Sequence, residues 1–239
     1  MDYERAAETA PPGWRHFTLA DVERLPPWVR SHELARVPPT DRKLLAAGDP
    51  GTTDRVLRAF FWTLVYHLEP AMWDELSRFE PIHPGLLASL PDRLLRVLEV
   101  GAGSGRFTAH LARRSETVLA IEPALGLANL LRSRVPEVRV ARAWAEALPV
   151  EDGWSQLTTA CGSIGPDPAA LRELARVTAQ GGEIVLISPE CPEWFESNGW
   201  DRLTLERLAA PPHAGWIDTF FGPLDPPHEL VSKHIAGRS

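Results

Sequence analysis

The sequence contains little cysteine and no long apolar run. Cys161 and Cys191 are the two cysteines among 239 residues, too few for the disulfide frameworks that hold small secreted domains together. No uninterrupted apolar stretch approaches the roughly 20 residues of a membrane-spanning helix. The first residues also lack the basic and then apolar segments of a secretory signal. We therefore expect a soluble, cytoplasmic protein without a membrane partner.

Positive charge is also scarce. The chain has 25 lysine and arginine residues against 32 aspartate and glutamate residues, which gives a formal net charge of −7. Lysine occurs only at Lys43 and Lys233, and the sequence has no run of basic residues. Proteins whose main partner is nucleic acid carry basic patches, so we expect no nucleic-acid partner.

Residues 1–90 have the pattern of a helical segment. They contain proline pairs at positions 11–12, 26–27 and 38–39. Such pairs divide a segment into short helices. A longer helix is predicted from a cap at Thr53 or Asp54 to a break or kink at Pro70. We expect residues 1–90 to form an N-terminal helical cap that contributes to a substrate site.

Residues 91–239 alternate short apolar runs with longer amphipathic segments, which is typical of a parallel sheet covered by helices. The predicted strands are 95–100, 117–121, 137–141, 156–160 and 183–188. The predicted helices are 105–114, 124–134, 168–178 and 193–209. After residue 214, two strand-like runs flank a proline-rich turn, which favours an antiparallel pair.

The segment RVLEVGAGSGRFTAHLARRSETVLAIEP, residues 96–123, contains the most informative motif. It predicts a strand, a glycine-rich turn, a helix and a second strand ending at Glu122, a unit that holds adenosine-containing cofactors. The dinucleotide fingerprint requires a glycine where Arg106 stands, which disfavours a nicotinamide oxidoreductase. A phosphate-binding P-loop requires a lysine that is absent here. The remaining pattern is Glu99, Gly101, Gly103 and Gly105.

With this pattern, residues 85–190 resemble the class I S-adenosylmethionine-dependent methyltransferases. VLEVGAGSGRFTAHLA resembles the first motif of that family, and AIEP resembles the acidic end of its second strand. AEALP resembles the loop before the fourth strand, and LRELARVTAQGGEIVLI resembles the helix, turn and fifth strand. The resemblance implies an α/β, Rossmann-like, doubly wound sheet of seven mostly parallel strands with an antiparallel C-terminal pair. This domain would span residues 91–239, beside the helical cap.

The resemblance also implies S-adenosyl-L-methionine as the cofactor and in-line methyl transfer to oxygen, nitrogen or carbon of a small-molecule acceptor. Glu99 would hold the methionyl ammonium. Glu122, at an open edge where its carboxylate would otherwise lie in water, would accept hydrogen bonds from both ribose hydroxyls. The predicted cofactor-binding residues are Glu99, Gly101, Ala102, Gly103, Gly105, Glu122, Pro123, Trp144, Ala145, Glu146 and Cys161.

Two positions depart from the family pattern. Trp144 stands where the family often has an aspartate that contacts adenine, and its indole either stacks on adenine or covers an edge of the core. The fourth strand commonly begins with Phe-Asp in the family, whereas Trp154 and Ser155 stand here. These departures leave open a cofactor-binding or regulatory homologue without catalysis.

Methyl transfer from a sulfonium needs a general base only when the acceptor keeps its proton at neutral pH. The candidates for such a base are His83 and Tyr66. Thiolates of Cys161 and Cys191 offer an alternative, a thiol-assisted methyltransferase of a soft metalloid. We predict no resident metal, and a homodimer stays open as the assembly.

Overall fold

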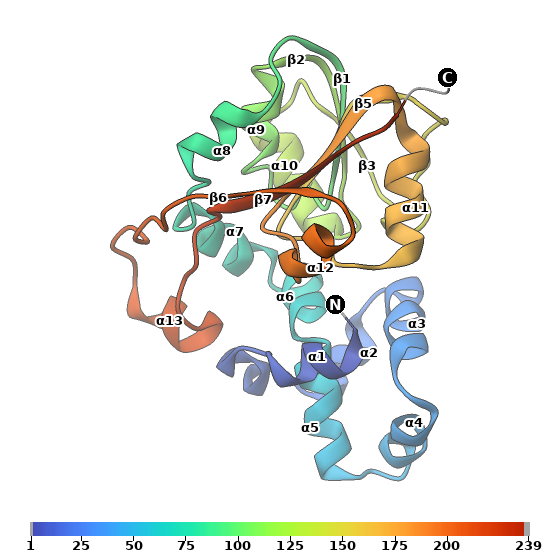
Figure 1. Ribbon diagram of the computed structural model, residues 1–239. Helices are drawn as coiled ribbons and strands as arrows, with labels where there is room; N and C mark the ends of the chain where they lie inside the picture. Colours follow the sequence, from blue (N-terminus) through green and yellow to red (C-terminus); the bar gives the residue numbers. More distant parts are fainter. Residues whose placement is uncertain (1, 237–239) are drawn as a thin grey trace. The chain divides into compact units, whose positions relative to one another are not determined.

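The computed structural model describes residues 2–236 (Figure 1). Contacts divide the chain into two compact units. The first unit comprises the chain up to Leu76 together with Pro212–Leu224, and the second comprises Ser77–Pro211 together with the residues from Asp225 on. This division follows the contacts within the chain, and it does not test whether each unit folds on its own as a domain. The domains 1–90 and 91–239 therefore stay a prediction.

Short helices build the first unit. They are α1 (Tyr3–Glu8), the 3₁₀-helix η1 (Pro12–His16), α2 (Leu19–Arg24), α3 (Pro27–Arg36), α4 (Pro39–Ala46), α5 (Pro50–Ala59), α6 (Phe61–Leu68), α7 (Pro70–Arg78), which ends in the second unit, and α13 (Gly215–Phe221). The proline pairs divide the chain as predicted, because Pro12, Pro27 and Pro39 are each the first residue of a helix. Proline suits this position because its φ angle is already helical and a first-turn amide has no partner within the helix.

The long helix predicted before Pro70 is divided at Phe60 into α5 and α6. The predicted cap at Thr53 or Asp54 is wrong. The cap is Asp49, whose carboxylate accepts a first-turn amide at 2.7 Å, and a proline at the next position is a strong start signal. The break at Pro70 is confirmed, because α7 begins there.

An aromatic core joins α6 to α13 within the first unit. Phe61 is fully buried, and its ring centroid lies 5.6 Å from that of Phe220. Trp62 stacks on Phe221 with centroids 5.8 Å apart. Residues 212–224 are therefore part of the hydrophobic core of the first unit, although they follow most of the second unit in the sequence.

The second unit contains a seven-stranded sheet with the order β3-β2-β1-β4-β5-β7-β6. The strands are β1 (Leu94–Val100), β2 (Ser115–Ile121), β3 (Arg139–Ala141), β4 (Ser155–Cys161), β5 (Thr178–Ile187), β6 (Asp201–Thr204) and β7 (Glu229–His234). β7 is antiparallel to β5 and β6, and the other neighbouring strands are parallel. The predicted Rossmann-like sheet is confirmed. Its strand order reverses between β1 and β4, the place where ligands bind in open α/β sheets.

Helices cover both faces of this sheet (Figure 1). They are α8 (Pro84–Ser89), α9 (Thr108–Ala112), α10 (Leu125–Arg134), α11 (Pro168–Val177) and α12 (Pro192–Ser197). Successive side chains of a strand point to opposite faces. Val97 accordingly packs in one core cluster with residues of α8, α9 and α10, and Leu98 packs in the other with residues of α11 and α12.

The prediction of a helix over 193–209 is wrong beyond Ser197. The helix ends at Ser197 with Asn198 as its C-cap, and Gly199 then takes a φ of +76°, which glycine adopts without strain. β6 follows and pairs with β7, and Arg202 donates to Glu229 at 2.7 Å across the pair. The antiparallel pair therefore exists, but its first strand is Asp201–Thr204. The strand-like run after residue 214 is instead the helix α13.

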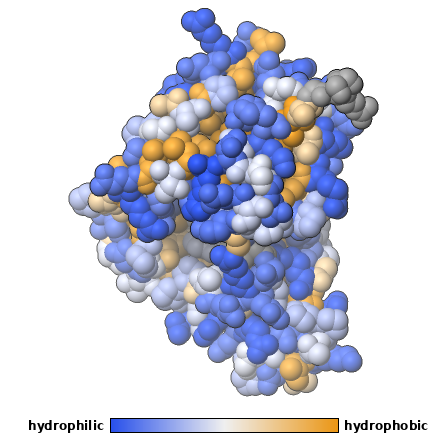
Figure 2. All heavy atoms as spheres, in the orientation of Figure 1, coloured by the Kyte–Doolittle hydropathy of each residue, from blue (hydrophilic) through white to orange (hydrophobic). Residues whose placement is uncertain are grey.

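Large exposed apolar side chains are scattered over the surface. They are Leu19, Trp28, Leu44, Leu95, Leu125, Trp194 and Trp216, and each belongs to a different element. Figure 2 shows mainly hydrophilic residues on the visible face, with small groups of hydrophobic residues between them. Within residues 2–236, no helix has the length and apolar character needed to cross a bilayer.

Candidate cofactor site

The glycine loop after β1 has backbone angles that favour glycine. Gly101, Gly103 and Gly105 have φ angles of +71°, +57° and +93°, in the left-handed region where other residues are strained. A Cβ on Gly101 would lie 2.4 Å from Ser163 Oγ. The amides of Gly101 and Ala102 donate to the carbonyl of Ile121 at 2.9 and 3.0 Å. The loop is therefore held against the end of β2.

Glu122 lies directly beside this loop. Its Oε2 accepts the amide of Gly103 at 2.8 Å, and its Oε1 accepts the amide of Ala124 at 2.7 Å. Burial raises the pKa of Glu122 to about 7, although both amides and Arg142 favour the ionised form. Our expectation of a carboxylate in water is thus wrong, since Glu122 is only 4% exposed. A carboxylate offers about four acceptor positions, so two remain for ligand hydroxyls.

A second buried carboxylate lies on β1. Glu99 is 1% exposed and accepts a hydrogen bond from Thr108 Oγ1 at 2.6 Å. Burial, together with the negative charge of Glu122, raises its pKa to about 8, although Thr108 and Arg106 favour the ionised form. A buried carboxylate is stabilised by a cation or by several donors. Glu99 is therefore suited to accept an ammonium group of a ligand.

The residues after β3 include Trp144, Ala145 and Glu146. Trp144 and Ala145 are half-buried, and Glu146 is exposed. Ala145 packs against the core cluster under α11. The carbonyl of Trp144 accepts the amide of Ala147 at 3.2 Å in a turn. The half-burial of Trp144 fits either role of its indole, stacking on adenine or covering an edge of the core.

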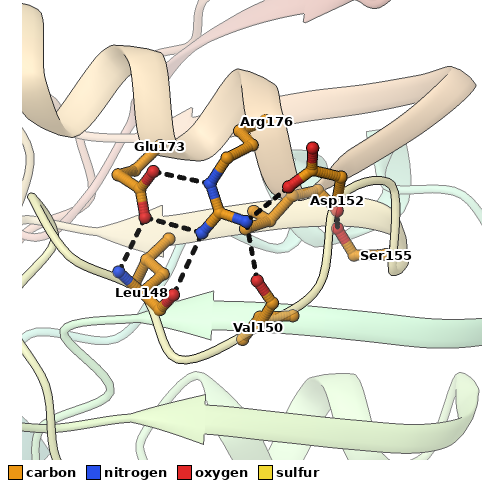
Figure 3. Close-up of polar contacts among 7 residues, drawn as sticks. Leu148, Val150, Asp152, Ser155, Glu173 and Arg176 are labelled. Atoms are coloured by element: carbon orange, nitrogen blue, oxygen red, sulfur yellow. Dashed lines mark hydrogen bonds and ion pairs between the residues drawn. The ribbon is translucent and has the colours of Figure 1, made fainter.

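Arg176 on α11 holds the loop that follows this turn (Figure 3). Its guanidinium donates to the carbonyls of Leu148 and Val150 at 3.0 and 2.7 Å and to the carboxylate of Asp152 at 2.7 Å. Glu173, one turn earlier, pairs with Arg176 and accepts the amide of Leu148 at 2.8 Å. The planar guanidinium suits this set of bonds because it carries five donors in fixed directions. Residues 148–152 are therefore held by the pair of Arg176 and Glu173.

Cys161 ends β4 and lies beside Arg106. The Arg106 guanidinium contacts the thiol sulfur at 3.7 Å and also pairs with Glu80. Burial raises the pKa of the Cys161 thiol, while Arg106 lowers it. The thiolate is the form that binds metals and metalloids, so a raised pKa disfavours the thiol-assisted alternative. Cys191 precedes α12 at its N-cap position in a left-handed conformation, and neither cysteine forms a disulfide. Among the described residues, no group of three metal-binding side chains is present.

The two candidate bases lie in different units. His83 in the second unit caps α8, and its Nδ1 accepts the amide of Gly85 at 2.9 Å. Tyr66 in the first unit lies 5.9 Å from Trp62 and 4.9 Å from Trp73 between ring centroids. Their roles stay predictions.

Sequence reasoning missed three side chains that shape the site. Thr108 donates to Glu99, Ser163 donates to the carbonyl of Val100 at 3.0 Å, and Arg142 donates to the carbonyl of Pro123 at 3.0 Å. A polar residue at a buried helical position could have indicated Thr108. Arg142 directly follows β3 and could have been placed at the carboxyl edge. The sequence around Ser163 has no comparable feature that would have indicated its place in the site.

The comparisons agree with this geometry. Residues 97–182 match a family of methyltransferase domains. An uncharacterized methyltransferase of Mycobacterium tuberculosis is 34% identical over 100 residues, which cover 41% of this chain and 41% of that protein. Demethylmenaquinone methyltransferase of Beutenbergia cavernae is 31% identical over 145 residues, which cover 54% of this chain and 60% of that protein. The chain thus spans less than two thirds of the length of these relatives.

A solved structure shares the fold. The crystal structure of a SAM-dependent methyltransferase from Aquifex aeolicus superimposes with a TM-score of 0.50 and 18% identity, covering 70% of this chain and 97% of that one. The glycine loop, the acid after β2 and the strand order are those that the sequence resemblance implies. Residues 97–182 therefore form a methyltransferase domain, and the sheet around them has the fold of an S-adenosylmethionine-dependent methyltransferase.

Proposed function

We propose that this protein transfers a methyl group from S-adenosyl-L-methionine to a small-molecule acceptor. The observation that carries the proposal is the pair of buried carboxylates on either side of the glycine loop. Glu99 offers an acceptor for a cation, and Glu122 retains acceptor positions for two hydroxyls. These acceptor positions match the ammonium group and the two ribose hydroxyls of the cofactor.

The cofactor supplies an activated methyl group on a sulfonium that is already an excellent leaving group. The residues of the chain therefore have to bind and orient the cofactor and the acceptor, and to exclude water from the site. Gly101, Ala102, Gly103 and Gly105 would bring backbone amides to the ligand, and Pro123 and Trp144–Glu146 would border its adenine. Cys161, at the end of β4, would line the remaining side. The name of the B. cavernae relative, a demethylmenaquinone methyltransferase, supports a small-molecule acceptor.

A hydroxyl acceptor would require a base, whereas a neutral amine would not. In His83, Nδ1 is engaged in capping α8, so Nε2 would accept the proton. Tyr66 is the alternative base. The pH profile of kcat and the loss of turnover in His83→Ala or Tyr66→Phe distinguish them.

Isothermal titration calorimetry of the full chain with S-adenosylmethionine and with S-adenosylhomocysteine tests cofactor binding. We expect saturable binding of both and none of NAD at matched concentrations. Saturable NAD binding with no response to the adenosyl compounds would overturn the proposal. Transfer of a labelled methyl group to acceptors in a metabolite extract then tests catalysis, and binding without any transfer would identify a homologue that lacks activity.

A further inference from the structure

The side chains of Thr108 and Glu99 join the two ends of the glycine loop. Glu99 is the next-to-last residue of β1 and Thr108 is the first residue of α9, so residues 101–105 lie between them in the sequence. The Thr108 hydroxyl donates to Glu99 Oε2 at 2.6 Å. Both side chains are buried, which shields the bond from bulk water. One side-chain hydrogen bond therefore connects the segments before and after the loop.

The two buried carboxylates of the site differ in what holds them. Glu122 accepts the amides of Gly103 and Ala124, so the main chain fixes both of its oxygen atoms. Within residues 2–236, the bond from Thr108 is the one hydrogen bond that the Glu99 side chain accepts, and it engages Oε2. The orientation of Glu99 therefore depends on the identity of a single side chain.

The Thr108 hydroxyl also acts on the charge of Glu99. Burial raises the pKa of Glu99 to about 8, and the negative charge of Glu122 acts in the same direction. The hydrogen bond from Thr108 is the largest contribution that lowers this pKa, ahead of the positive charge of Arg106. A donor to a carboxylate stabilises its charged form. Without the hydroxyl, Glu99 would be ionised less often near neutral pH, and its carboxylate would lose its one side-chain donor.

We propose that Thr108 is a positioning residue that holds the Glu99 carboxylate in the orientation and ionised form that accept the ammonium group of the cofactor. The inference rests on the proposed function and adds a residue to it. Thr108 acts through Glu99, so its effect is confined to ligands that carry the ammonium group.

The first test compares two ligands by calorimetry of the full chain. They are S-adenosylhomocysteine and its analogue in which hydrogen replaces the amino group. Thr108→Val keeps the branched shape without the hydroxyl and should weaken binding of S-adenosylhomocysteine about tenfold, the effect of losing a hydrogen bond to a charged group. Binding of the analogue should not change. Thr108→Ser keeps the hydroxyl and should bind both ligands as the wild type does, and Thr108→Ala replaces the valine variant if that variant does not fold.

Thr63→Val is the matched control. Thr63, in the first unit, donates to Oε1 of Glu33 at 3.1 Å, and Glu33 is also buried. The substitution removes the same kind of bond between a threonine and a buried glutamate. It should lower the stability of the protein without changing its affinity for S-adenosylhomocysteine.

A double-mutant cycle then tests whether Thr108 acts through Glu99. In the Glu99→Gln background, Thr108→Val should cause no further loss of affinity for S-adenosylhomocysteine. The affinity of Thr108→Val alone should rise with pH at a higher pH than that of the wild type, because Glu99 ionises later without its donor.

Three results would overturn the inference. They are unchanged affinity in Thr108→Val, equal losses for the two ligands, and a full further loss in the Glu99→Gln background. The last two would show that Thr108 only holds the glycine loop. Failure of the wild type to bind either ligand would instead overturn the proposed function, and this inference with it.

Discussion

Glu122 at the end of β2 accepts a hydrogen bond of 2.8 Å from the backbone amide of Gly103 in the loop after β1. One carboxylate thus joins the two parallel strands at the edge where the cofactor is expected. The same oxygen atoms serve the protein without ligand and would serve the ribose with ligand. Affinity and fold stability are therefore coupled at this residue.

Glu122→Gln should lower both the affinity for the cofactor and the stability of the fold. The amide group of glutamine can replace one acceptor oxygen, but its NH₂ would face the N–H of Gly103 or Ala124 and leave a buried donor unpaired. We expect a loss of about 1–3 kcal/mol in unfolding free energy and about tenfold or more in affinity for S-adenosylhomocysteine. Chemical denaturation and calorimetry measure the two effects. Glu137→Gln, at an exposed position near β3, is the matched control, and unchanged stability in Glu122→Gln would contradict the two-amide geometry.

The stability of the protein without ligand should fall as pH rises. Burial raises the pKa of Glu122 to about 7 and that of Glu99 to about 8, from an ordinary value of 4.5. The folded state therefore holds both protons more tightly than the unfolded chain. Their contribution to stability is complete below pH 4.5 and is lost as pH rises through 7 and 8. Thermal unfolding across this range should show the decline, and Glu99→Gln should make it shallower.

Affinity for S-adenosylhomocysteine should change with pH in the opposite sense. An ammonium ligand binds the ionised form of Glu99, so its affinity should rise with pH up to the pKa of about 8, and binding should release protons. Calorimetry in two buffers of different ionisation enthalpy measures this release. Proton uptake, or an affinity that does not vary over this range, would show that Glu99 does not bind the ammonium.

Gly101→Ala should destabilise the protein more than Gly162→Ala. Both glycines have positive φ angles, +71° and +70°, and alanine in this region costs about 1–2 kcal/mol. A Cβ on Gly101 would also collide with Ser163 Oγ at 2.4 Å, whereas a Cβ on Gly162 would meet no atom within 4 Å. Denaturation of both variants isolates the collision. Combining Gly101→Ala with Ser163→Gly should recover the difference, and a failure to recover it would mean that another contact is responsible.

Arg176→Ala should loosen residues 148–152 without unfolding the sheet. The Arg176 side chain is 32% exposed, so the loss in unfolding free energy should be modest, about 1–2 kcal/mol. Hydrogen exchange should increase at the amide of Leu148, which depends on Glu173 for its acceptor. Arg176→Lys should also increase hydrogen exchange at this amide, because an ammonium group cannot replace the planar guanidinium and its paired donors. Arg172→Ala, an exposed residue of the same helix, should change neither measurement.

Trp144→Ala decides between the two roles of the indole. Because Trp144 is only half-buried, we expect its indole to stack on adenine, and the variant to lose about 1–3 kcal/mol of binding free energy, by analogy with base stacking. Thermal stability should change little. A large drop in stability with normal affinity of the folded protein would instead assign the indole to the core.

The sheet could be predicted from the sequence because its central strands are apolar runs separated by glycine and proline signals. β1, β2, β4 and β5 all overlap the expected ranges. The error over 193–209 has a local cause. DRLTLERL has good helix formers, and only Gly199 indicated a stop, while the strand identity of residues 201–204 depends on pairing with β7, which is distant in sequence.

The environment of the site was harder to predict than its residue types. The position of Glu122 followed from the family pattern, but its burial did not. Its partners are backbone amides, and the amide of Gly103 lies 19 residues away. The same limit applies to Arg176, whose acceptors include two carbonyl oxygens that leave no trace in side-chain identity.

The sheet order has a consequence for how the protein assembles during synthesis. Within the described residues 2–236, β6 pairs with β7 alone, and β7 separates it from β5. β6 is synthesised before β7, so it has no strand to pair with until residues 229–234 have been synthesised. The intervening residues 212–224 belong to the other unit, so every segment of the aromatic core of the first unit is synthesised before β7, the strand that completes the sheet of the second unit. β7 therefore has to be synthesised through residue 234 before its pairings with β5 and with β6 can both be complete.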